Sequence, residues 1–101
     1  MTISIKLEAE FSVGLPRIFG LVNDVAGWSV FDRPRVLNAK NGKISLAFED
    51  LTRAFIEFKV EDGVTKLRIV HELLKSEAEI HPRELYWEEV LAGFRRRVEL
   101  S

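Results

Sequence analysis

Alternating and helical patterns of apolar residues divide the chain into strands and helices. The first strand is predicted from residue 3 to residue 11, where apolar residues alternate with polar or charged ones. This period of two is typical of a half-buried antiparallel strand. A short helix is expected from about Pro16 to Asn23, because proline suits a first helical turn and apolar residues recur there at helical spacing. A turn or a second short helix follows around Trp28 and Phe31.

The middle of the chain predicts four more strands joined by tight turns. They are expected near residues 35–40, 44–48, 53–60 and 66–73. Asn41-Gly42 between the first two is the strongest two-residue hairpin signal in the chain. Consecutive strands joined by such short turns must run antiparallel and form a meander.

A long amphipathic helix is expected from Pro82 onward, after a polar connector from Lys75 to His81. Its length of about 27 Å matches the roughly 26 Å of an eight-residue strand, so it can lie across the whole sheet. The predicted fold class is α+β, with an antiparallel sheet of about five strands wrapped around this helix and one or two short helices after the first strand. A single domain is expected over residues 1–101. One apolar stripe of the helix would face the sheet, made of Trp87, Val90, Leu91, Phe94 and Val98.

Composition favours an ordinary globular domain over a nucleic-acid binder. The 15 basic and 16 acidic residues nearly cancel, so the net positive field of a nucleic-acid-binding protein is missing. There is no cysteine, which excludes disulfides and thiolate metal sites. The first residues read as a strand with charged alternate positions, which is neither a signal peptide nor a membrane span. A cytoplasmic protein is therefore expected.

Three local features of the chain match a known pattern. A short helix runs on to Trp28, a late strand ends in His71, and the last helix carries Trp87-Glu88-Glu89-Val90-Leu91 followed by Phe94. Together with the order of elements, they resemble the helix-grip fold of the START and Bet v 1 (SRPBCC) superfamily. The chain is most similar there to the family of the C-terminal domain of Aha1, the activator of the Hsp90 ATPase. Family members usually carry an extra hairpin after the helical part, but here only about a dozen residues separate Trp28 from Asn41-Gly42. The resemblance therefore implies a shortened form.

The resemblance implies that the domain binds a hydrophobic small molecule or lipid between the last helix and the sheet. His71 would supply the one polar contact, because strand alternation with Leu67 and Ile69 points it toward the helix. We favour the simpler interpretation, in which the aromatic residues fill a core and His71 is satisfied by ordinary partners. The candidate ligand-binding residues are Trp28, Phe31, Phe48, Phe58, Ile69, His71, Trp87, Leu91 and Phe94.

Two alternative functions stay open. One is a protein-interaction module, including a homodimer, because a shortened sheet has edge strands that can pair with another chain. The resemblance to the Aha1 family implies a cochaperone-like role for such a module. The weaker alternative is a polyketide cyclase or dehydratase-like enzyme, which needs His71 and a second polar group facing one cavity. His71-Glu72-Leu73-Leu74-Lys75 lacks the second histidine of the zinc motif H-E-x-x-H. The sequence therefore predicts no catalytic residues, no metal site and no cofactor.

Overall fold

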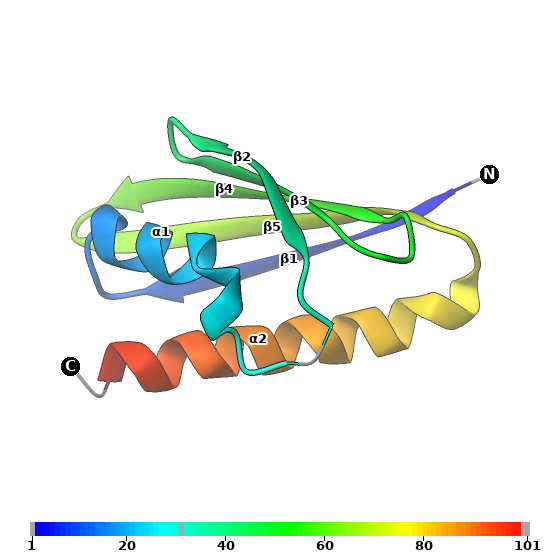
Figure 1. Cartoon of the computed structure of the whole chain (residues 1–101). Coiled ribbons are helices and arrows are strands. Elements are labelled where there is room, and N and C mark those ends of the chain that lie inside the picture. Colours follow the sequence, from blue (N-terminus) through cyan, green and yellow to red (C-terminus); the bar gives the residue numbers. More distant parts are fainter. Residues whose placement is uncertain (1, 31, 100–101) are drawn as a thin grey trace.

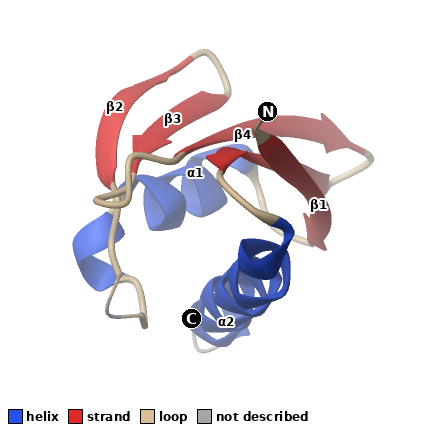
Figure 2. Ribbon diagram, turned by 90° about the vertical axis from the view of Figure 1, so that its right-hand side faces the viewer, coloured by secondary structure: helices blue, strands red, loops and turns tan. Residues whose placement is uncertain are grey.

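A computed structural model describes residues 2–30 and 32–99 and shows one antiparallel sheet with both α-helices packed on one face (Figures 1 and 2). The predicted α+β class, with a five-stranded sheet, short helices after the first strand and a long C-terminal helix, is confirmed. The elements in chain order are β1 (Ile3–Phe11), α1 (Leu15–Asn23), the 3-10 helix η1 (Val25–Gly27), β2 (Arg35–Lys40), β3 (Lys43–Ala47), β4 (Arg53–Glu61), β5 (Val64–Leu74), the 3-10 helix η2 (Glu77–Glu79) and α2 (Ile80–Glu99).

The sheet has the strand order β1-β5-β4-β3-β2, so the predicted meander is confirmed and β1 and β2 are the two edges. Asn41 and Gly42, with φ of 55° and 72°, turn β2 into β3. Asp62 and Gly63, with φ of 50° and 77°, turn β4 into β5. Tight two-residue hairpins of type I′ need positive φ at both positions, which glycine, asparagine and aspartate tolerate best.

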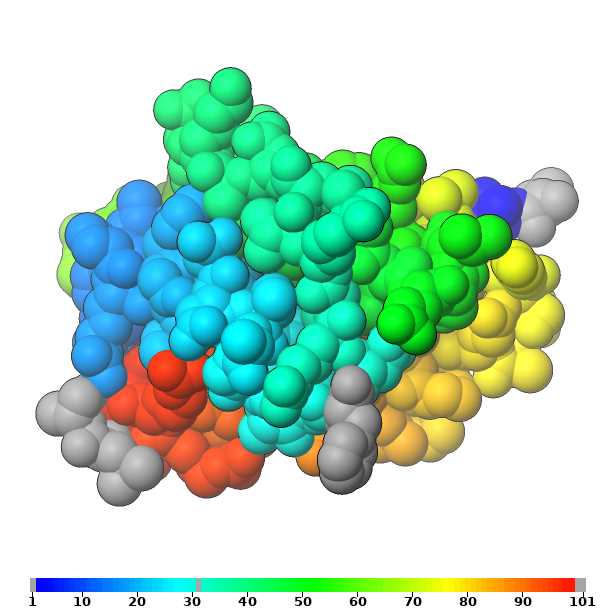
Figure 3. Space-filling model, viewed as in Figure 1, coloured from blue at the N-terminus to red at the C-terminus, as the bar shows by residue number. Residues whose placement is uncertain are grey.

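The hydrophobic core lies between the sheet and the two helices. α2 runs under β1 and α1 lies beside it under β4, so both helices cover the inner face (Figure 2). In the space-filling view, α1 and η1 lie on the near side of this layer (Figure 3). The predicted apolar stripe of α2 faces the core, with Trp87, Val90 and Phe94 buried and Leu91 and Val98 half-buried at its margins.

The prediction of a polar connector from Lys75 to His81 is wrong for most of that segment. Residues 77–79 form a 3-10 turn, and α2 already begins at Ile80. The Glu79 carboxylate accepts the backbone N–H of Ser76 (2.9 Å) and that of Lys75 (2.6 Å). Serine followed three residues later by glutamate is the capping-box signal of a helix start, which our sequence prediction overlooked.

A bulge near the end of β5 corrects the predicted alternation there. His71 pairs with Ile5, but Leu74 pairs with Ile3, so β5 carries one extra residue at this point. Leu73 takes a positive φ of 69°, as the extra residue of a bulge often does. Leu74 therefore enters the core instead of Leu73, which the sequence pattern had placed on the inner face.

Candidate functional site

His71 is the polar residue at the centre of the inner face. It stands on β5 between Ile5 of β1 and Ala54 of β4 in the register, and its side chain is fully buried. Its predicted direction, toward the helix, is the one observed, since it packs against Trp87 of α2. A buried imidazole must find partners for both ring nitrogens, because an unpaired polar group in a core is costly.

Protein groups occupy both ring nitrogens of His71. The Trp87 indole Nε1–H donates to His71 Nδ1 (3.0 Å). An indole can only donate, so Nδ1 is the acceptor and the neutral ring carries its proton on Nε2. His71 Nε2–H then donates to Thr52 Oγ1, 2.7 Å away. The hydrogen-bonding capacity of the ring is thereby used within the protein.

The hydrogen bonds continue from His71 to the surface. The Thr52 hydroxyl donates to Asp50 Oδ1 (2.5 Å), and the Thr52 backbone N–H donates to the same oxygen (3.0 Å). Arg83 of α2 donates to Asp50 Oδ2 (2.8 Å) and also pairs with Asp32 (3.0 Å). We call Trp87, His71, Thr52, Asp50 and Arg83 the His71 chain; it joins α2 to the sheet through polar contacts inside and outside the core.

Aromatic rings enclose the His71 chain. The centroids of the Phe48 and His71 rings lie 4.7 Å apart. Phe48 also contacts Arg83, whose guanidinium carbon lies 4.6 Å from the Phe48 centroid. The same guanidinium lies 4.9 Å from the Tyr86 centroid. Only 12% of the Arg83 side chain is exposed, so this cation is held between two rings and two carboxylates. Such a planar, weakly hydrated cation suits that environment better than a lysine would.

The burial of these groups sets their charges. Burial, together with the positive charge of Arg83, lowers the pKa of His71 to about 4. Burial alone would raise the pKa of Asp50, but hydrogen bonds from Thr52 and Arg83 outweigh it and hold that pKa at about 2. Burial raises the pKa of Tyr86, and the charge of Asp32 adds to the effect. At neutral pH the His71 chain therefore contains a neutral imidazole and an ionised carboxylate.

The structure brings most of the predicted ligand residues together, and it does so as mutual packing partners. The Trp28 ring meets Trp87 edge-on at 5.8 Å and Phe94 at 5.6 Å. Phe48 and Ile69 are also buried in this cluster, and Leu91 is half-buried beside it. Phe58 instead packs against Phe19 of α1, at 5.1 Å. Phe31 lies outside the described residues.

Sequence analysis missed the outer members of the His71 chain. Asp50 and Thr52 stand in the β3–β4 connection, which the sequence pattern marked only as a turn. An aspartate two residues before a threonine is a signal for this local hydrogen bonding. Arg83 comes four residues before Trp87, hence on the same side of α2, and that spacing could have indicated that both residues face the sheet.

Two of the hollows beside predicted ligand residues differ from an apolar binding cavity in size or lining. One of about 190 Å³ lies between the η1 turn and α2, beside Trp28, Gly93 and Phe94. Another, of about 730 Å³, lies along charged residues of the outer face such as Glu57 and Arg68. Ligand pockets typically hold 300–1,000 Å³ and are mainly apolar. The first hollow is small for that purpose, and the second has the wrong lining.

In residues 2–30 and 32–99, no group of three or more histidine, cysteine, aspartate or glutamate side chains is arranged to hold a metal ion. In the same residues, no helix combines the length and the apolar character that crossing a membrane requires.

Comparison with known proteins rests on structure alone. No family model matches the chain, and no curated protein matches its sequence. Among solved structures, the AHSA1-like protein from Aeromonas hydrophila is similar with a TM-score of 0.75 and 16% identity, over 97% of this chain and 93% of that one. The Aha1 dimer from Colwellia psychrerythraea gives a TM-score of 0.72 and 10% identity, over 89% and 92%.

A third solved structure has the same fold at a lower sequence identity. Ara h 8.0201 is similar over the whole of both chains, with a TM-score of 0.67 and 6% identity. Identities this low establish a shared fold and leave function to be argued from the residues. The resemblance predicted from the sequence is confirmed at that level: the chain has the helix-grip fold of the AHSA1-like and Bet v 1-like proteins.

Proposed function

We propose that this domain binds other protein chains through the outside of its sheet. The observation that carries the proposal is a contrast in how side chains are used. The polar groups of the interior are paired with one another, whereas large apolar side chains stay exposed on the opposite face. Exposed apolar clusters with a polar surround are a common mark of protein-binding surfaces.

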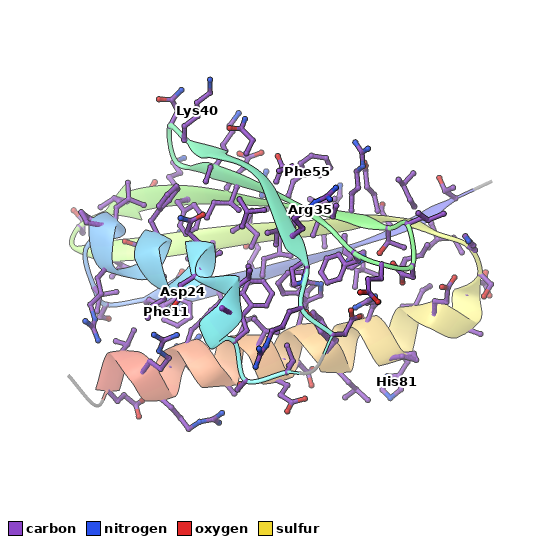
Figure 4. All side chains as sticks on the ribbon, viewed as in Figure 1. Phe11, Asp24, Arg35, Lys40, Phe55 and His81 are labelled. Atoms are coloured by element: carbon purple, nitrogen blue, oxygen red, sulfur yellow. The ribbon has the colours of Figure 1, made fainter. Side chains whose placement is uncertain are left out.

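Two of the exposed large apolar side chains, Leu37 and Phe55, lie on the outer face where β2, β3, β4 and β5 are side by side. Phe55 of β4 is paired with Ser45 of β3 and Val70 of β5, and it points away from α2 (Figure 4). Leu37 stands at a bulge in β2, next to the residue that pairs with Ser45. Phe55 is 36% exposed and Leu37 is 44% exposed. We call Leu37, Phe55 and Val70 the outer patch.

Charged residues surround the outer patch. Arg53 and Glu57 flank Phe55 on the same face of β4, and Arg35 lies at the start of β2. An aromatic side chain inside a charged rim is the arrangement that supplies affinity at the centre and orientation at the edge of an interface. A cochaperone-like role is a more specific version of this proposal, and only the likeness of fold to Aha1 supports it.

A photo-reactive amino acid in place of Phe55 tests the proposal in the cells that make the protein. Leu85 of α2, which is 50% exposed, is the matched control position. We expect defined cross-linked protein bands from position 55 that are absent from position 85. Equal cross-linking at both positions, or none at position 55, would contradict a binding role for the outer patch.

A ligand in the interior is the second candidate function, because Phe48 and Trp87 pack against His71 and the rings of Trp28 and Phe94 lie next to them. It requires those rings to part, since they now contact one another. Native mass spectrometry of the protein as purified would support it by showing one small apolar molecule per chain. The cyclase-like alternative has the least support, because both nitrogens of His71 are bonded to protein groups.

A further inference from the structure

The open edge at β1 presents a regular row of backbone groups that no other strand of the described sheet pairs with. The Phe58 N–H donates to the Gly42 carbonyl (2.9 Å), so even-numbered residues of β4 point their backbone groups toward β3. The register carries this alternation across β5 to β1. Odd-numbered residues of β1 therefore bond to β5, and Lys6, Glu8 and Glu10 point their N–H and C=O groups at the open edge.

A contact from α2 agrees with this assignment. Arg95 lies against the Phe11 ring, 4.6 Å from its centroid, and donates to the Glu10 carbonyl (3.0 Å). Glu10 is one of the even-numbered residues of β1, so its carbonyl faces the open edge. A carbonyl oxygen has two acceptor lone pairs, so the Arg95 contact leaves one for another chain.

We propose that two copies of this chain pair antiparallel along β1, with Leu7 opposite Leu7 at the two-fold axis. The inference goes beyond the proposed function, because it concerns the β1 edge and not the outer patch, and it names the partner there as a second copy. Lys6 of each copy then lies opposite Glu8 of the other, twice by symmetry. Both residues point their backbone groups outward, so each opposed pair can exchange two backbone hydrogen bonds.

The side chains of β1 are self-complementary in this one register. On the outer face, Lys43, Glu57, Arg68 and Glu8 already alternate in sign across the sheet. Lys6 of the second copy continues that alternation beside Glu8. On the inner face, the same register places Ile5 opposite Ala9, which extends the apolar side of the sheet. Opposite charges directly across two strands stabilise the pair, and like charges there destabilise it.

The other edge of the sheet is unsuited to the same pairing. A bulge interrupts β2 between Val36 and Asn38, and a bulge breaks the regular row of backbone groups. An antiparallel pairing of β2 with itself would place Arg35 opposite Lys40, which brings like charges together. The charge pattern thus selects β1 as the dimer edge and a second copy as its occupant.

Sedimentation velocity of the full chain from micromolar to millimolar concentration tests the proposal by charge exchange. We expect a dimer for the unmodified protein. Lys6→Glu and Glu8→Lys should each weaken it roughly 10-fold or more, because two symmetric pairs change from attraction to repulsion. The double variant Lys6→Glu/Glu8→Lys restores opposite charges at both pairs and should return the dimer to near the original strength.

Glu57→Lys is the matched control. Glu57 and Glu8 both stand opposite Arg68, one on each side of β5, but Glu57 is remote from the edge. This variant should leave the dimer unchanged. A monomer at all concentrations, single variants without effect, or a double variant as weak as the singles would each overturn the β1 dimer. Cross-linking at position 55 tests the outer patch, whereas sedimentation of the Lys6 and Glu8 variants tests the β1 edge. A negative result in one experiment therefore leaves the other proposal standing.

Discussion

The two faces of the sheet use their polar residues in opposite ways. On the inner face, His71 is buried and its partners Trp87 and Thr52 use both of its nitrogens. On the outer face, charged residues stand in exposed ladders, and the 3.8 Å pair between Glu8 and Arg68 leaves both side chains mostly in solvent. The comparison teaches that a residue such as His71, which is often found in binding sites, is not a binding group when protein partners already use its hydrogen bonds. A group can bind a partner only where the fold leaves its hydrogen-bonding capacity or its apolar surface unused.

The largest expected effect comes from opening the inner face. Trp87→Ala removes a fully buried ring that also donates to His71, and it should lower the free energy of unfolding by about 3–5 kcal/mol. Leu85→Ala, on the exposed side of the same helix, should change it by no more than about 0.5 kcal/mol. Urea denaturation of both variants measures the difference. Similar losses for the two would mean that α2 is not held by its inner stripe.

Acid should weaken the inner face through His71 before it affects Asp50. The pKa of His71 is about 4 in the folded protein and 6.5 in its ordinary state, so the unfolded chain takes up the proton first as pH falls. Stability is therefore complete above pH 6.5 and decreases between pH 6.5 and 4, by up to roughly 3 kcal/mol. The stabilisation from Asp50, whose pKa is about 2, is lost only below about pH 3.8.

His71→Gln supplies the control for the acid effect. Glutamine can accept from the Trp87 indole and donate to Thr52, but it does not titrate. Its free energy of unfolding should therefore be nearly flat between pH 6.5 and 4, although lower than that of the unmodified protein at pH 7. A variant that keeps the same slope would show that another group causes the acid loss.

A smaller effect should separate Thr52 from the other buried threonine. Thr52→Val removes the acceptor for His71 Nε2–H and should cost about 1–3 kcal/mol, because the buried proton is left unpaired. Thr65 donates one hydrogen bond to the Val13 carbonyl, and Thr65→Val should cost about 1 kcal/mol. Thermal or urea unfolding ranks the two. The reverse order would remove the His71 chain from the account of stability.

The smallest effect on stability is expected on the outer face. Phe55→Ser should change the free energy of unfolding by about 0.5 kcal/mol or less, because the ring lies on the solvent-facing side of the sheet and is already 36% exposed. The same variant should abolish recovery of any partner identified by cross-linking at this position, as measured by co-purification. A folded variant that still retains the partner would place the binding surface elsewhere.

The sequence pattern was sufficient for the elements and their order, because period-two and helical spacing are local signals. It placed β1 from Ile3 to Phe11 and the hairpin at Asn41-Gly42 where the structure has them. It missed the bulge at Leu73, since one extra residue in a strand leaves the alternation before it unchanged. The early start of α2 was recoverable in principle from the serine–glutamate cap.

The candidate site was predictable only in part. Alternation along β5 correctly placed His71 on the inner face, but its partners come from residues 19 positions before and 16 positions after it. Such distant contacts depend on how the β3–β4 connection and α2 fold over the sheet, which no local pattern encodes. The gathering of Trp28, Trp87 and Phe94 was likewise expected, whereas their close contact with one another was left open by the sequence.

The state of the His71 ring tests most directly whether the inner face is closed. Nitrogen-15 NMR of the imidazole and of the Trp87 indole, followed from pH 7.5 to 5, reports which nitrogen carries the proton. Our account predicts a neutral ring with the proton on Nε2 throughout this range, and a Trp87 N–H signal that does not shift. A ring that titrates near pH 6.5, or that carries its proton on Nδ1, would contradict the account and would reopen the interior as a binding site.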